Sequence, residues 1–90
     1  MTAATAAAMA QFDEQRNLVR LRDHLAEFGV HAEMRDNYSA LMVRRPEPGL
    51  PVWVFVGYGG AFYSWQNANK RHSVDDPRGA AKILAEYVAR

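Results

Sequence analysis

The residues that could carry acid, base or metal chemistry are three histidines and scattered carboxylates. His24, His31 and His72 lie far apart in the sequence, and none stands at the spacing of a helical zinc site from another ligand. We therefore expect no metal site and no cofactor. An enzymatic centre would need a pocket that brings His31 or His72 together with a carboxylate, and spacing alone predicts no such pocket.

The sequence contains no motif for a nucleophile or a phosphate loop. No serine lies in a GxSxG elbow; this holds for Ser39, Ser64 and Ser73. The glycines of residues 57–60 precede an expected strand rather than the helix that a phosphate loop requires, so they indicate a hairpin turn. Asp75 and Asp76 are adjacent carboxylates at the start of an expected helix, where they indicate capping. We expect no catalytic residues and no enzymatic activity.

Large rings are concentrated in residues 52–65, VWVFVGYGGAFYSW. Side chains alternate along a strand, so Trp53 and Phe55 point away from the valines between them, and both faces of this strand are apolar. One face can meet the core, and the other is expected to contact a partner. Depending on register, either Tyr63 and Trp65 or Phe62 accompany the first two rings. The predicted partner-binding residues are Trp53, Phe55, Tyr63 and Trp65.

Basic side chains flank this aromatic segment. Rings on a sheet beside cations can stack bases and hold phosphates, which makes nucleic-acid binding the alternative function. The predicted phosphate contacts are Arg44, Arg45, Lys70 and Arg71. A protein-interaction surface needs fewer assumptions, because tryptophan and tyrosine are enriched in interfaces. The expected partner is therefore a protein or a second copy of the chain, and no membrane partner is expected.

The elements that must position these residues follow from periodicity. Leu18, Leu21, Leu25 and Phe28 recur at steps of three and four, which predicts a helix over residues 12–28 that ends at Gly29. The alanine-rich residues 1–11 are expected to be a mobile lead-in to a single domain over residues 12–90. A second helix is predicted from about Asp76 to the end of the chain, because its apolar residues also follow helical spacing.

Four strands are predicted between the helices. Residues 30–35 alternate between apolar and polar, and the next strand, residues 38–44, follows a turn at Asp36 and Asn37. Three prolines interrupt residues 45–51, which are expected to form a loop before the strands 52–56 and 61–65. Residues 66–74 are polar and are expected to form an exposed loop. The fold class is α+β: a helix, a four-stranded antiparallel meander and a helix, with both helices on one sheet face.

Composition places the chain among ordinary globular domains. Of the 90 residues, 49% are hydrophobic and 23% are charged, and the formal net charge of +1 gives no field that would demand a polyanionic partner. There is no cysteine, which excludes disulfides and thiolate metal sites. No apolar run approaches the length that spans a bilayer, and a cytoplasmic location is expected.

The pattern of the whole chain resembles a group of short actinobacterial α/β proteins. The similarity includes a leucine-striped helix ending in EFGV, a proline-rich loop, the aromatic hairpin and a final helix with AAKILAEYV. That resemblance implies no activity. Arg78 to Lys82, followed by Ala85, is similar to the second helix of double-stranded RNA-binding domains, which also order a helix, a meander and a helix. The similarity covers about ten residues, and two aspartates stand where that family places lysines.

Overall fold

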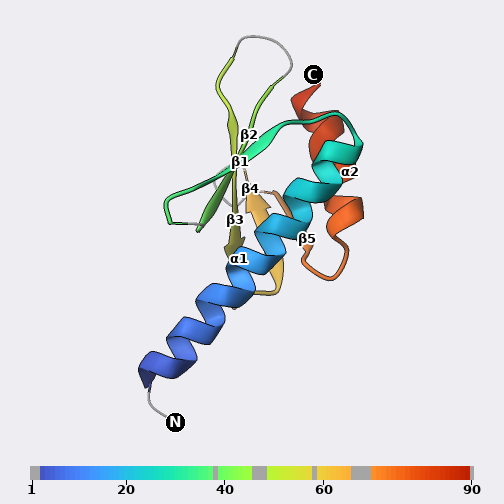
Figure 1. Cartoon of the computed structure of the whole chain (residues 1–90). Helices are drawn as coiled ribbons and strands as arrows, with labels where there is room; N and C mark the ends of the chain where they lie inside the picture. Colours follow the sequence, from blue (N-terminus) through green and yellow to red (C-terminus); the bar gives the residue numbers. More distant parts are fainter. Residues whose placement is uncertain (1–2, 38, 46–48, 58, 66–69, 90) are drawn as a thin grey trace.

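The computed structural model describes residues 3–37, 39–45, 49–57, 59–65 and 70–89 of the chain. The elements follow the order α1 (Ala3–Glu27), β1 (Ala32–Arg35), β2 (Ala40–Val43), β3 (Val52–Gly57), β4 (Phe62–Trp65), β5 (Lys70–Ser73) and α2 (Pro77–Val88). The strands form one antiparallel sheet in which each strand pairs with the next along the chain. Both helices pack on this sheet (Figure 1). The predicted α+β class and antiparallel meander are confirmed.

The fifth strand is a correction, because β5 lies where the sequence predicts an exposed loop. Residues 66–69 of that predicted loop lie outside the described residues. β5 pairs with β4, so that His72 lies opposite Tyr63 and Lys70 lies opposite Trp65. The strand has no apolar alternation because it is at the edge of the sheet, where charged side chains are common and protect against further pairing.

Helix α1 begins at Ala3, earlier than the predicted residue 12, and ends as predicted before Gly29. Gly29 has φ +75°, and the N–H groups of Gly29 and Val30 donate to the carbonyls of Ala26 and Leu25. This is the pattern of a Schellman cap, and a side chain at Gly29 would be strained there. The predicted mobility of residues 1–11 stays a prediction, and residues 1–2 lie outside the described part of the chain.

The turn that joins β1 and β2 is where the sequence predicts it. Asp36 and Asn37 both have positive φ, at 53° and 55°, a conformation that these two residue types tolerate better than most. The N–H and the hydroxyl of Ser39 both donate to the carbonyl of Asp36, at 3.1 and 2.6 Å. Local hydrogen bonding therefore stabilises the reversal and sets the β1–β2 register.

Helix α2 begins at the capping site that the sequence predicts. Oδ1 of Asp76 accepts the N–H of Gly79 at 3.1 Å, Oδ2 lies 2.9 Å from Nε2 of His72, and Pro77 occupies the first turn. These contacts, the one from His72 first, lower the pKa of Asp76 below its ordinary value. Ile83 is one of the apolar residues whose helical spacing predicts this helix, but it is 42% exposed. The buried α2 residues are Pro77, Ala80, Ala81, Leu84 and Val88.

One hydrophobic core lies between the helices and the sheet. The leucines of α1 predicted for this role, Leu18, Leu21 and Leu25, are fully buried, whereas Phe28 follows the helix and is 39% exposed. The strand residues that meet them alternate with outward-pointing ones; those that belong to the core are Ala32, Leu41, Val43, Val52, Val54, Tyr63 and Trp65. In the described part of the chain, no helix combines the length and apolarity needed to cross a membrane.

Candidate functional site

The register of the β3–β4 hairpin decides which rings are available to a partner. Tyr63 lies opposite Val56, so it shares the face of the valines and is fully buried. Trp65 points the same way and is 3% exposed. The prediction that Tyr63 and Trp65 belong to the partner-binding set is therefore wrong: both are core residues. The register agrees with the alternative in which Phe62 accompanies Trp53 and Phe55.

The sheet face opposite the helices, here called the outer face, carries the rings that remain accessible. Trp53 is 39% exposed and Phe55 is 46% exposed. Both are predicted partner-binding residues, and they stand two positions apart on the central strand β3. Met42 beside Trp53 is buried, and Phe62 is half-buried. We call Met42, Trp53, Phe55 and Phe62 the outer-face stripe.

The outer-face stripe crosses the sheet diagonally because the first half of β3 pairs with β2 and the second half pairs with β4. Residues 52–54 pair with β2, which places Met42 opposite Trp53. Residues 55–57 pair with β4, which places the small side chain of Ser64 opposite Phe55. Neighbours of unequal size leave the Phe55 ring standing above the sheet, and the stripe crosses from β2 to β4.

The four predicted phosphate contacts are divided between the two faces. Arg44 and Arg71 belong to the outer face, where the guanidinium of Arg71 lies 5.0 Å from the centroid of the Phe62 ring. Arg45 lies on the helix side, with its guanidinium 5.5 Å from the Tyr87 ring and its Nε donating to the carbonyl of Leu50. Lys70 also lies on that side, beside Trp65. The structure does not bring the four cations together.

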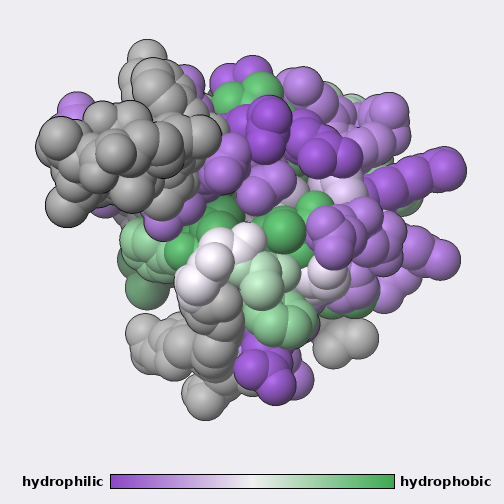
Figure 2. Space-filling view, turned by 90° about the horizontal axis from the view of Figure 1, so that it is seen from below, coloured by the Kyte–Doolittle hydropathy of each residue, from purple (hydrophilic) through white to green (hydrophobic). Residues whose placement is uncertain are grey.

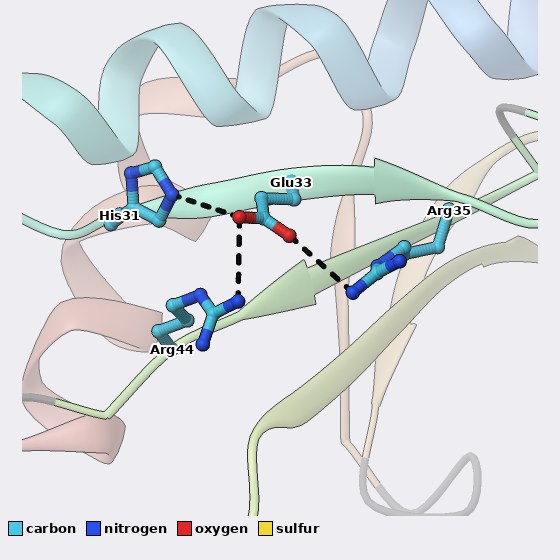
Figure 3. A network of polar contacts seen from close by, with 4 residues as sticks. All are labelled: His31, Glu33, Arg35 and Arg44. Atoms are coloured by element: carbon cyan, nitrogen blue, oxygen red, sulfur yellow. Dashed lines mark hydrogen bonds and ion pairs between the residues drawn. The ribbon is translucent and has the colours of Figure 1, made fainter.

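A polar network borders the stripe at the β1 edge (Figure 3). One carboxylate, that of Glu33, lies 3.3 Å from Nε2 of His31, 3.4 Å from Arg44 and 3.6 Å from Arg35. The hydrogen bond with His31, followed by the charge of Arg44, lowers the pKa of Glu33 despite some desolvation. We call these four residues the Glu33 cluster. Alternation indicates from sequence that residues 31, 33 and 35 share a face, but the contact with Arg44 depends on strand pairing.

All three histidines lie beside a carboxylate, as a catalytic site would require, but among the described residues none of the pairs has further catalytic components. His24 and Glu27 form an exposed pair one helical turn apart on α1, with 3.2 Å between Nδ1 and Oε2. His31 and Glu33 lie on the open outer face, and the carboxylate of Asp76 beside His72 is occupied by the α2 cap. Among the described residues, no serine hydroxyl is hydrogen-bonded to any of these histidines, and no group of three side chains could hold a metal ion. These pairs are best explained as surface and capping contacts.

A cleft of about 510 Å³ opens between α1 and the β3–β4 turn. Its α1 wall carries charges of both signs, including Asp13, Arg16 and Arg20, and Val56 and Val74 supply apolar surface. Figure 2 views the molecule from below, and hydrophobic residues gather in the middle of that face with hydrophilic ones beside them. The described residues lining this cleft include the carboxylates of Asp13, Glu14 and Asp75 but no histidine or serine.

Comparison with protein-family models, with curated proteins and with solved structures finds no match for this chain. The function must therefore be argued from the chemistry of the outer face.

Proposed function

We propose that this chain is a non-enzymatic interaction module that binds a protein partner through its outer face. The observation that carries the proposal is the exposure of Trp53 and Phe55 in the middle of a sheet whose other face is already covered by both helices. Exposed rings at the centre of a sheet cost hydration free energy, and burial against a partner recovers it. Tryptophan in particular is common among the residues that dominate binding energies.

Charges around the stripe indicate the chemistry of the partner. Three arginines belong to the outer face, Arg35, Arg44 and Arg71, and the carboxylate of Glu33 contacts the first two of them. The described part of this face therefore has an excess of positive charge beside its rings. A complementary partner segment carries apolar side chains for the stripe and a small number of Asp or Glu residues for the flanks.

A second copy of the chain fits this face less well than an acidic partner. Two copies meeting face to face would bury ring against ring, which favours association. They would also bring together two surfaces with the same excess of positive charge, which opposes it. We therefore assign the face to a different protein, and the self-association expected from the sequence becomes an outcome that experiment can detect.

Nucleic acid remains the alternative occupant. Trp53 and Phe55 could stack bases, and Arg71 lies over a ring of the same face. However, Lys70 and Arg45 contact the helix side instead, so fewer cations flank the rings than the sequence predicts. This placement supports a protein segment over a polyanion.

Selection of displayed random peptides on the purified protein tests the proposal. We expect enrichment of peptides that combine Asp or Glu with Leu, Phe or Trp. A synthetic peptide made from the enriched sequence, measured by fluorescence anisotropy, should lose at least about thirtyfold in affinity with Trp53→Ala or Phe55→Ala, since hot-spot truncation costs at least about 2 kcal/mol.

Ile83→Ala is the matched control, because Ile83 is an exposed apolar residue of similar exposure on α2. It should leave peptide binding unchanged. A sedimentation series over protein concentration, run in parallel, reports any dimer. The proposal fails if no acidic and apolar peptide is enriched, if binding survives the loss of both rings, or if a Trp53-dependent dimer forms instead.

A further inference from the structure

We infer that Glu33 determines the specificity of the outer face by suppressing its affinity for polyanions such as single-stranded nucleic acid. This inference rests on the proposed function and concerns the same site. It follows from the Glu33 cluster, in which one carboxylate contacts two of the three arginines that belong to the outer face. Of the four described residues that form the Glu33 cluster, Glu33 is the one that carries a carboxylate.

The geometry lets the Glu33 carboxylate form ion pairs with both guanidiniums at once. Oε1 of Glu33 lies 3.4 Å from Arg44, and Oε2 lies 3.6 Å from Arg35 (Figure 3). His31 contacts Oε1 as well, at 3.3 Å, and adds a third interaction that holds the carboxylate between the strands. Because Glu33 is on β1 and Arg44 follows β2, the β1–β2 register maintains this arrangement.

Pairing of Arg35 and Arg44 with Glu33 lowers affinity for a polyanion more than affinity for a short acidic peptide. Nucleic acids carry a phosphate at every nucleotide, and their affinity grows with each phosphate that a cation neutralises. Glu33 lowers the charge of this corner and adds a negative group that repels an approaching phosphate. A protein partner with few carboxylates depends less on these cations, because it buries its apolar side chains on the rings.

The size of the effect follows from counterion release. For single-stranded nucleic acid, the logarithm of affinity falls by roughly 0.7 per phosphate contact for each decade of salt. Each added contact is therefore worth roughly eightfold in affinity at 50 mM relative to 1 M salt. Releasing one of Arg35 and Arg44 should therefore increase affinity by roughly eightfold and steepen the salt dependence by roughly 0.7, and releasing both should give roughly sixtyfold and 1.4.

Titration of a fluorescein-labelled oligothymidylate with the full chain tests the inference. Glu33→Gln keeps the size of the side chain, removes its charge and replaces one of its two acceptor oxygens with an NH2 donor. We expect it to bind the oligonucleotide at least about eightfold more tightly than the natural chain at 50 mM salt. Adding Arg44→Gln to Glu33→Gln should remove much of that gain, and adding Trp53→Ala should also reduce it if bases stack on the stripe.

Glu86→Gln is the matched control, because it changes the net charge equally at an exposed position on α2. A gain with Glu33→Gln alone supports the inference. Equal gains in both variants, or no gain in either, overturn it. Peptide selection is a separate measurement: if acidic peptides bind through Trp53 while Glu33→Gln gains nothing, the specificity role fails and the proposed function stands. Tight oligonucleotide binding by the natural chain, without peptide binding, defeats both.

Discussion

At the scale of single residues, Tyr63 shows how a ring expected at the interface serves the core instead. It is fully buried, and its hydroxyl donates to the backbone carbonyl of Asn17 in α1 at 2.7 Å. Burial raises the pKa of Tyr63 to about 12, because the phenolate would lose hydration without gaining a full counter-charge from Arg20. The side chain therefore joins the sheet to α1 only in its neutral form.

Stability at high pH tests this role. Since the folded pKa of Tyr63 lies above the unfolded value of 10.0, its contribution is fully present below pH 10 and is lost as pH rises toward about 12. In that window the unfolding free energy should fall by up to about 1.4 kcal/mol per pH unit from this group.

Tyr63→Phe provides the comparison, measured by urea unfolding at several pH values. At pH 7 we expect a loss of about 0.5–1.5 kcal/mol for the missing hydrogen bond. Above pH 10 the variant should lose stability less steeply than the natural chain. Parallel curves for the two proteins would contradict the assignment, since the other tyrosines are common to both.

At the scale of elements, the sequence predicts most helices and strands but not their registers. The end of α1 is predicted by leucine spacing and Gly29, and the β1–β2 turn is predicted by Asp36 and Asn37. Both predictions rest on local sequence and are confirmed. β5 has no such signal, because an edge strand of polar residues is defined by its pairing with β4. Likewise, the division of rings between core and outer face depends on a one-residue choice in the β3–β4 register, which alternation alone does not determine.

Two tryptophan substitutions test that register. Trp65 is 3% exposed on the helix side, so Trp65→Ala should cost about 3–5 kcal/mol of unfolding free energy. Trp53 is 39% exposed on the outer face, so Trp53→Ala should cost distinctly less and should mainly affect binding. Urea unfolding of both variants gives the comparison. Equal losses would show that both rings serve the core and would remove the candidate site.

At the scale of the whole molecule, the length of α1 dominates the shape. The principal extents are 47, 24 and 22 Å, and the amino-terminal part of α1 reaches beyond the sheet (Figure 1). A helix of 25 residues is about 37 Å long. Among the α1 side chains that the structure describes, Leu18 is the first that is fully buried. The sequence predicts this helix only from residue 12, because apolar spacing does not indicate how far a helix extends beyond its core.

Amide hydrogen exchange tests the consequence of this shape. We expect amides in the first half of α1 to exchange much faster than those of residues 18–27, because the amino-terminal part of α1 reaches beyond the sheet and a projecting helical segment opens readily. Exchange measured by mass spectrometry or NMR at two protein concentrations gives the comparison. Uniform protection along α1, especially if it increases with concentration, would mean that a second copy covers the projecting segment.

The neighbour-to-neighbour strand order has a kinetic consequence. Each hairpin closes a short loop, so the sheet can grow one reversal at a time with little entropic cost. The packing of α1 on α2 is different, because it joins the two ends of the chain around the shared core. Hairpin growth can therefore precede the meeting of the helices, and refolding should be limited by the step that brings the terminal segments together.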